Sequence, residues 1–348
     1  MDLRQLGNSN VSVSPVTFGA WAIGGWMWGG SEEQDSIAAI QASIDAGVTS
    51  IDTAAIYGQG HSEELVAKAI KGRRDKVQIL TKCGMRWDDA RGSDPWATLN
   101  NQGRAITVTR NSKADSIAHE CEQSLRRLGV DVIDVYQIHW PDLTTPIDES
   151  IEAMYKLQKA GKVRAIGVSN YNLKQISTAD SWLKEHGSVL ASHQPPYSVI
   201  NRGIEKEILA YCRQMNVGIV CYSPMERGLL TGKYGPDHKF PAGDHRNNYK
   251  AFKPDVRKSV AAALAQVKSI ADRHKASFAQ LIVNWTFSEP GITAALVGAR
   301  NAEQAVHNAG AMAFRLSDVE RQQIRAAFSP AAELMGGDGA PARPGAQT

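Results

Sequence analysis

The sequence is poor in the features that mark several large classes of protein. Its 348 residues contain no apolar run close to the roughly 18 residues that cross a membrane, and the N-terminal stretch MDLRQLGNSN lacks the apolar core of a signal peptide. The four cysteines are far apart and form no C-x-x-C pair, so we expect reduced thiols in a cytoplasmic protein. The formal net charge of +3 is small and evenly spread, which argues against nucleic-acid or membrane partners.

What the sequence does contain is a regular alternation of short apolar runs with amphipathic stretches. The intervening stretches, such as 36–47, 116–129 and 150–162, have helical periodicity and end near a glycine. Eight strand–helix units predict a (β/α)8 barrel. The alternative, a doubly wound sheet, usually has a G-x-G-x-x-G turn after its first strand, and FGAWAIGGWMWGG lacks it. The eight apolar runs lie at residues 14–19, 48–52, 77–82, 132–140, 163–170, 188–194, 218–224 and 292–298.

Three further segments lie outside these units. The stretch LRQLGNSNVSVS reads as a hairpin with Gly7 and Asn8 in its turn, which we expect to close the bottom of the barrel. The connections 83–112 and 224–256 are unusually long, and both leave the C-terminal ends of strands, where barrel enzymes keep their sites. We therefore assign residues 1–330 to one barrel domain and the Gly-, Pro- and Ala-rich residues 331–348 to a disordered tail.

Four polar residues stand at or just after neighbouring strand ends, namely Asp52, Tyr57, Lys82 and His139. Singly, a strand-end Asp is more often a cap, a lone His a packed core residue and a lone Lys a solvated charge, but their joint occurrence favours a site. A nearby ammonium lowers the pKa of a tyrosine, ordinarily about 10, and the buried lysine then needs the carboxylate. A neutral histidine can donate to a carbonyl oxygen that gains charge. The set predicts a proton donor beside a carbonyl that accepts a hydride.

Seven motifs occur in order over residues 3 to 328, namely GAWAIGG, DTAAIYGQGHSEE, LTKCG, YQIHWPD, GVSN, YSPMERGLLTGKY and GARNAEQAVHN. In this order they resemble the motifs of the aldo-keto reductase superfamily, within its bacterial branch related to the potassium-channel β-subunits. The resemblance implies that Asp52, Tyr57, Lys82 and His139 are the catalytic tetrad, with Tyr57 as general acid.

The resemblance also implies an extended NADPH molecule across the barrel mouth, because hydride transfer needs a carrier. In the family's pattern, Ser169, Asn170 and Gln194 bind the carboxamide and Tyr222 stacks on the nicotinamide ring. The segment that follows the pyrophosphate is matched by Ser223, Pro224, Met225, Gly228 and Lys233, and the adenosine end by Gly298, Arg300, Gln304 and Asn308. Arg300, just before an expected helix start, suits the 2′-phosphate through its planar donor fork. The expected cofactor residues are Ala20, Trp21, Asp52, Ser169, Asn170, Gln194, Tyr222, Ser223, Pro224, Met225, Gly228, Lys233, Arg246, Gly298, Arg300, Gln304 and Asn308.

The expected function is reduction of a small-molecule aldehyde or ketone, by a monomer or a homo-oligomer. No metal site is expected, because GHSEE lacks the H-E-x-x-H spacing and Ser62 reads as a helix N-cap. Two alternatives stay open: a cofactor-sensing binding protein of the channel β-subunit type, and an aldolase with Lys82 as Schiff-base nucleophile. The expected substrate pocket comprises Trp21, Trp26, Trp28, Tyr57, Met85, His139 and Trp140.

Overall fold

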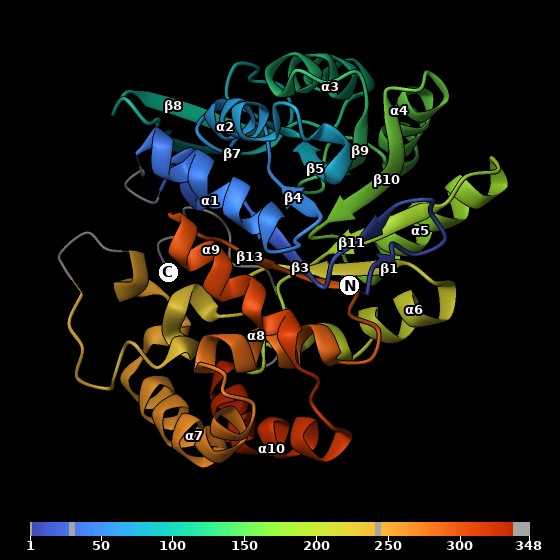
Figure 1. Ribbon diagram of the computed structural model, residues 1–348. Helices are drawn as coiled ribbons and strands as arrows, with labels where there is room; N and C mark the ends of the chain where they lie inside the picture. The colour runs from blue at the N-terminus through green and yellow to red at the C-terminus, as the bar shows by residue number, and fades with distance from the viewer. Residues whose placement is uncertain (1, 28–31, 241–244, 337–348) are drawn as a thin grey trace.

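The computed structural model describes residues 2–27, 32–240 and 245–336, and its centre is a closed barrel of eight parallel strands (Figure 1). Each barrel strand coincides with one of the eight apolar runs, with β5 extending one residue beyond its run, so the predicted (β/α)8 barrel is confirmed. The strands follow the chain around the barrel, and the last pairs with the first through Leu296 and Thr17. They are β3 (Val16–Gly19), β4 (Ser50–Asp52), β5 (Gln78–Cys83), β9 (Ile133–Ile138), β10 (Val163–Ser169), β11 (Leu190–Gln194), β12 (Gly218–Cys221) and β13 (Ala294–Val297).

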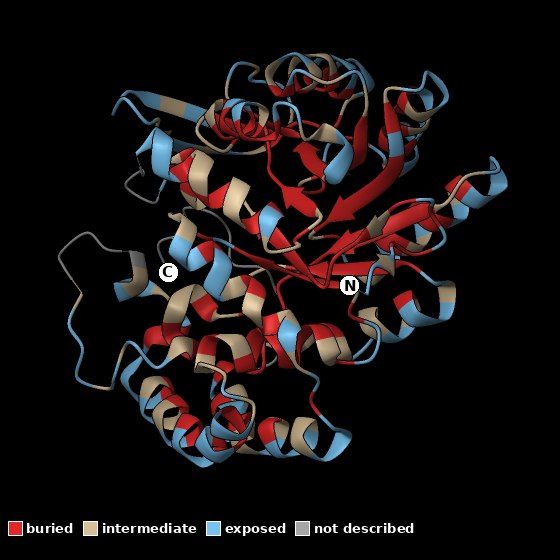
Figure 2. Cartoon of the chain, in the orientation of Figure 1, coloured by how far each residue is buried: buried red, intermediate tan, exposed pale blue. Residues whose placement is uncertain are grey.

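Helices surround the barrel and bury its outer face, so that the strands are buried almost throughout (Figure 2). Several begin with the local chemistry that favours a helix start: α5, α8 and α10 each have a capping box. Helix α3 ends at Gly129, whose left-handed φ of 63° suits a glycine. The helices are α1 (Glu33–Asp45), α2 (His61–Ile70), α3 (Ala114–Leu128), α4 (Ile147–Lys159), α5 (Leu173–Glu185), α6 (Ile208–Met215), α7 (Pro254–Arg273), α8 (Phe278–Ser288), α9 (Ala302–Ala309) and α10 (Asp318–Met335).

The N-terminal hairpin closes the bottom of the barrel, as expected. Strands β1 (Arg4–Gln5) and β2 (Ser12–Val13) pair antiparallel, and Leu6 between them is fully buried with side chains of the barrel interior. The turn lies so close to the barrel that a Cβ on Gly7 would meet the carbonyl oxygens of Ala191 and Asn216 at 2.7 Å. The hairpin is therefore a plug, and the opposite, C-terminal end is the open face.

The connection 83–112 differs from the expected loop because it folds into a second sheet. Strands β6 (Met85–Arg86), β7 (Ser93–Leu99) and β8 (Ala105–Arg110) form this antiparallel sheet in the order β6-β8-β7. In the described residues of the other long connection, 224–256, three short 3-10 turns precede the start of α7, namely η4 (Glu226–Thr231), η5 (His245–Asn248) and η6 (Lys250–Phe252). Both segments extend from the C-terminal ends of barrel strands, next to the tetrad.

The C-terminal boundary of the fold needs a correction. Helix α10 continues to Met335, where Ala331 and Met335 are buried, so the expected tail at 331–348 begins five residues too early. Residues 337–348 lie outside the described part of the chain.

All four cysteines are buried free thiols, in keeping with the expected reduced state. In the described residues, no helix is both long and apolar enough to traverse a bilayer; a cytoplasmic location stays a prediction.

Candidate active site

The four strand-end residues meet at the open face of the barrel. Asp52 ends β4, Lys82 lies near the end of β5 and His139 directly follows β9. The Lys82 ammonium donates to Asp52 Oδ1 at 2.5 Å and to the Thr53 carbonyl at 2.9 Å, and lies 3.4 Å from the Tyr57 hydroxyl. The rings of Tyr57 and His139 meet edge to face, with centroids 5.6 Å apart. The structure thus brings together every residue of the predicted tetrad.

Burial is the main cause of the pKa shifts of His139 and Tyr57. It lowers the pKa of His139 well below its usual value, and the charges of Lys82 and Arg110 act in the same direction, so the imidazole is neutral. Burial also raises the pKa of Tyr57 well above 10, with the charge of Asp52 adding to the effect. The expected net lowering of the Tyr57 pKa by Lys82 is therefore wrong, because burial of the hydroxyl raises this pKa and the charge of Asp52 acts in the same direction. At neutral pH both Tyr57 and His139 are hydrogen-bond donors, as a carbonyl oxygen requires.

Asp52 is held by more than its lysine. Its Oδ2 accepts hydrogen bonds from the amide groups of Gln194 at 2.8 Å and Gln137 at 3.3 Å. Gln194 was expected at the cofactor carboxamide. Its side-chain amide donates to the tetrad carboxylate, and its contact with the carboxamide stays a prediction. Gln137 was not predicted, although it stands two residues before His139 and so shares its face of the strand.

A second buried carboxylate lies behind Lys82. Glu63 accepts from the Thr81 hydroxyl at 2.6 Å and from Arg127 Nε at 2.7 Å. Its charge favours the protonated form of Lys82, whose pKa is lowered mainly by burial. Sequence analysis did not assign Glu63 to the site. Its partner Arg127 is 64 residues away, and no local pattern reports such a contact.

Ser62 has a different role from the expected helix cap. Gly60 occupies the N-cap position of α2, and the Ser62 hydroxyl lies 2.8 Å from Thr53 Oγ1 and donates to the Ala20 carbonyl at 2.9 Å. Since Ala20 also donates its amide to the Asp52 carbonyl at 2.8 Å, Ser62 ties together the segments after β3 and β4. The backbone amide of Ser62 also donates to the Tyr57 carbonyl at 3.1 Å, so Ser62 helps to hold the segment that carries Tyr57.

The residues expected at the nicotinamide form one hydrogen-bonded chain. The Tyr222 hydroxyl donates to Asn170 Oδ1 at 2.9 Å, and Asn170 Nδ2 donates to the His139 carbonyl at 2.9 Å. Ser169 Oγ donates to the Gln194 carbonyl at 2.7 Å. Asn170 has a left-handed φ of 60°, a strained conformation that often marks a functional position. The structure therefore joins these four residues to the tetrad, through the bonds of Asn170 to His139 and of Gln194 to Asp52.

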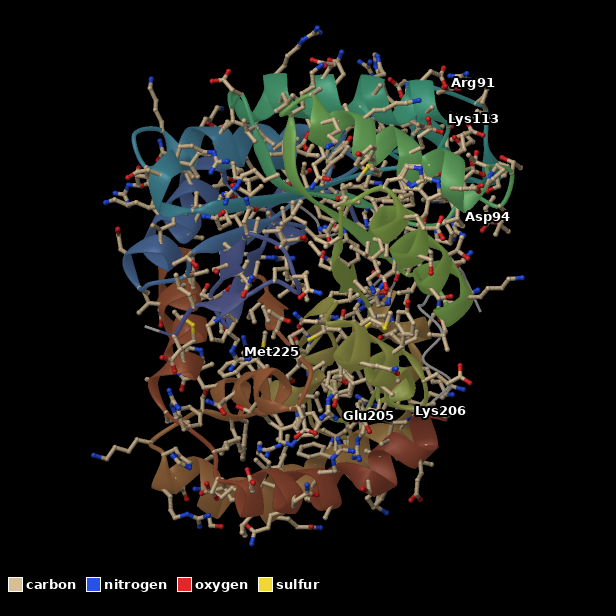
Figure 3. All side chains as sticks on the ribbon, turned by 90° about the vertical axis from the view of Figure 1, so that its right-hand side faces the viewer. Arg91, Asp94, Lys113, Glu205, Lys206 and Met225 are labelled. Carbon is tan, nitrogen blue, oxygen red and sulfur yellow. The ribbon has the colours of Figure 1, made fainter. Side chains whose placement is uncertain are left out.

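The expected phosphate-binding residues lie further round the rim. Ser223, Pro224, Met225 and Gly228 form the turn after β12, and Figure 3 shows Met225 well inside the outline of the molecule. Lys233 follows this turn and is exposed. A Cβ on Gly228, at φ 93°, would approach the Tyr234 ring at 3.2 Å. This turn therefore leaves little room for a side chain at Gly228.

Expected adenosine-end residues surround the start of α9. Gln304 accepts from the Arg300 amide at 3.0 Å and donates its own amide to Asn301 at 2.9 Å, while Asn308 donates to the Gly298 carbonyl at 3.0 Å. Arg246 is further away in the chain and lies over the rings of Tyr234 and Phe240. Cations and amides on this half of the rim fit an anionic dinucleotide by their chemistry.

An apolar wall covers the other half of the mouth. Trp26, Met85 and Trp140 are almost fully buried in one cluster, where Tyr57 packs against them, and Trp21 stacks with Tyr57 at 6.1 Å between centroids. Trp28, also expected here, lies outside the described residues. Sequence analysis missed Trp87 and Trp96, which pack against the same cluster from the β6–β8 sheet.

Comparison with known proteins finds similar chains over most of its length. The Aldo/keto reductase family profile matches residues 15–328. Aldo-keto reductase YhdN of Bacillus subtilis (strain 168) is 39% identical over 307 residues, covering 87% of this chain and 86% of that one. The NADH-specific methylglyoxal reductase of Escherichia coli (strain K12) is 33% identical over 326 residues, covering 92% and 96%. Among solved structures, the glycerol dehydrogenase AKR11B4 from Gluconobacter oxydans has a TM-score of 0.83 at 35% identity, covering 94% of this chain and 95% of that chain.

Proposed function

Because the chain belongs to the aldo/keto reductase family, we propose that it is an NADPH-dependent reductase that converts an aldehyde or a ketone to the alcohol. The family assignment itself makes the chain an oxidoreductase of carbonyl compounds that uses a nicotinamide cofactor. When bound, such a cofactor supplies a hydride, which no side chain can supply. The observation that carries the proposal is a protonated Tyr57 hydroxyl 3.4 Å from Lys82 and facing a neutral His139.

In the proposed mechanism, each tetrad residue has one task. His139 donates a hydrogen bond to the substrate oxygen and orients the carbonyl. Tyr57 transfers its hydroxyl proton to that oxygen as negative charge develops there. Lys82, fixed by Asp52 at 2.5 Å, stabilises the phenolate that Tyr57 becomes. The tryptophan-lined wall keeps water from the reacting carbonyl.

This geometry disfavours the aldolase alternative. A Schiff-base lysine must attack as a neutral amine with its lone pair free. Lys82 Nζ is instead committed to Asp52 and to the Thr53 carbonyl, and its side chain is fully buried. The sensor alternative is compatible with the same cofactor site, and turnover of a carbonyl substrate separates it from the proposed reductase.

Replacing Tyr57 by Phe tests the proton donor. We expect Tyr57→Phe to reduce carbonyl turnover by roughly 10²–10⁴-fold, because the general acid is lost, while NADPH binding, followed by nicotinamide fluorescence, persists. Tyr155→Phe is the control, since that hydroxyl donates to the His186 carbonyl on the outside of the barrel. Turnover of Tyr57→Phe within a few-fold of wild type would remove Tyr57 from this role.

The preference for NADPH is proposed from Arg300 alone, and one relative is described as NADH-specific. A hydrogen bond to a charged group contributes about 1.5–3 kcal/mol, so Arg300 at a 2′-phosphate separates the two cofactors by roughly tenfold or more. We expect Arg300→Ala to weaken NADPH binding and leave NADH binding unchanged, and the preference to shrink at higher salt. Titration of both cofactors decides this; equal wild-type affinities would contradict NADPH preference.

A further inference from the structure

A buried acid joins three loops at the cofactor half of the mouth. The Glu226 side chain, in the turn after β12, is fully buried. Its Oε1 accepts from the Ser198 hydroxyl at 2.6 Å and its Oε2 from the Tyr249 hydroxyl at 2.8 Å. Ser198 belongs to the segment after β11, and Tyr249 lies in the long connection before α7. Both carboxylate oxygens are therefore occupied by donors from other segments.

The turn that carries Glu226 is strained. Glu226, Arg227 and Gly228 follow one another with φ of 46°, 53° and 93°. Residues other than glycine rarely adopt such positive φ angles. Strained backbone persists only where surrounding contacts hold it, and it concentrates at functional positions. The bonds from Ser198 and Tyr249 are such contacts, because they anchor the first residue of the strained run.

The residue held by this network is Arg227. Its guanidinium lies over the ring of Tyr249, 4.0 Å from the centroid, so one tyrosine anchors Glu226 through its hydroxyl and supports Arg227 through its face. Burial raises the pKa of Tyr222, and the charge of Arg227 acts in the opposite direction. The guanidinium thus lies within electrostatic range of the ring expected beside the nicotinamide.

We propose that Ser198, Glu226 and Tyr249 form a clamp that positions Arg227 as a ligand of the cofactor pyrophosphate. The inference rests on the proposed function, because it assumes that a nicotinamide dinucleotide binds here. A planar guanidinium can bind two phosphate oxygens at once. Arg227 lies within the segment from Ser223 to Lys233, where the phosphates are expected. The pyrophosphate is common to NADH and NADPH, so Arg227 serves both, whereas Arg300 is proposed to read only the 2′-phosphate.

Two substitutions separate the ligand from its support. Arg227→Met should weaken the binding of NADPH and of NADH by the same factor, about tenfold or more. It should also reduce the salt dependence of both dissociation constants. Tyr249→Phe keeps the ring under Arg227 but removes the hydrogen bond to Glu226. It should therefore weaken the binding of both cofactors equally, and by less than Arg227→Met does. Ser198→Ala removes the other bond to Glu226 and should act in the same way.

Tyr211→Phe is the matched control, because that hydroxyl also donates to a carboxylate, Asp180, at 2.9 Å on the outer helices. Its dissociation constants should equal those of the wild type. All variants are titrated with both cofactors by nicotinamide fluorescence, and thermal melting confirms that each is folded. If Tyr249→Phe does not fold, Ser198→Ala gives the measurement.

Each outcome bears on a separate statement. A wild type that binds neither cofactor contradicts the proposed function itself. A wild type that binds both, with Arg227→Met unchanged, overturns only the role of Arg227. Loss of NADPH binding alone in Arg227→Met would mean that Arg227 reads the 2′-phosphate, which also overturns the pyrophosphate assignment. Normal binding by both Tyr249→Phe and Ser198→Ala, with loss in Arg227→Met, would overturn the clamp.

Discussion

Glu120 on α3 turns its carboxyl group toward the end of β5, where its two oxygens lie 3.0 and 3.1 Å from the Gly84 amide nitrogen. Burial raises the pKa of this carboxyl to about 8, although the Gly84 amide, Arg86 and Ser116 act in the opposite direction. Gly84 stands two residues after Lys82. The acid therefore supports the strand end that carries the proposed tetrad lysine.

This shift gives stability a pH dependence of known sign. The folded-state pKa of about 8 exceeds the ordinary 4.5, so the folded protein binds the extra proton. The associated stability is fully present below pH 4.5 and is lost as pH rises through 8. One pKa unit corresponds to about 1.4 kcal/mol, so the loss is on the order of several kcal/mol. We expect Glu120→Gln to flatten the fall in unfolding free energy between pH 5 and 8.

Urea unfolding of wild type and Glu120→Gln at pH 5, 6.5 and 8 makes the measurement. Glu149→Gln is the control, since Glu149 is exposed in the first turn of α4 and its loss should leave the wild-type slope in place. Parallel pH curves for Glu120→Gln and wild type would mean that Glu120 does not hold the additional proton.

The sequence predicted those properties of a residue that depend on its position in the chain, and not those that depend on distant packing. Asp52, Lys82 and His139 were found from their positions at strand ends, because parallel strands place those ends together. The pKa shift of Tyr57 was predicted in the wrong direction, since burial raises this pKa, while its role as a proton donor stays a prediction. Burial depends on the whole packing around a side chain, and a sequence pattern gives only the neighbouring charges.

At the scale of elements, the β6–β8 sheet was missed because its sequence interrupts the strand pattern. Pro95 and Asp94 stand in β7, and proline within an apolar run argues against a strand. The structure accommodates them at an edge strand, with a register shift between Ser93 and Trp96 and a left-handed Asp94 at φ 53°. The alternation resumes only after the irregularity.

Trp96 makes this sheet part of the proposed substrate wall. It packs from β7 against the cluster of Trp26, Met85 and Trp140. We expect Trp96→Ala to raise KM for an aromatic aldehyde by about tenfold, because burying a large apolar side chain contributes roughly 1.5–3 kcal/mol, and to change KM for a two-carbon aldehyde little. NADPH affinity should stay that of the wild type.

Steady-state kinetics with both aldehydes test this, with Thr107→Ala as control because Thr107 is exposed on the neighbouring strand β8. An equal rise in KM for both aldehydes would indicate a general disturbance of the mouth and not a substrate wall. Unchanged KM for the aromatic aldehyde would remove Trp96 from the pocket.

At the scale of the whole molecule, the barrel was predictable because its signal repeats eight times along the chain. The family was predictable because its motifs occur in order over residues 3 to 328. Helices cover the outer face of each barrel strand, and side chains of the barrel interior pack against its inner face. Each strand is therefore apolar on both faces and can be recognised in the sequence as a continuous apolar run. The family assignment is confirmed over residues 15–328. The long loops carry no such repetition, and their contacts, such as Ser198 and Tyr249 with Glu226, join segments that no pattern connects.

The plug at the barrel bottom should contribute to stability without affecting chemistry at the open face. Leu6 is fully buried against Leu80, Val135 and Val220 of the barrel interior, so Leu6→Ala should lower the unfolding free energy by about 2–5 kcal/mol. Leu3 on the same segment is 53% exposed, and Leu3→Ala should stay within about 0.5 kcal/mol of wild type. Denaturant unfolding of both variants, with turnover per folded molecule measured alongside, makes the comparison. Equal stability of the two variants would show that the hairpin is not part of the core, and lost turnover in folded Leu6→Ala would show that the two ends of the barrel are coupled.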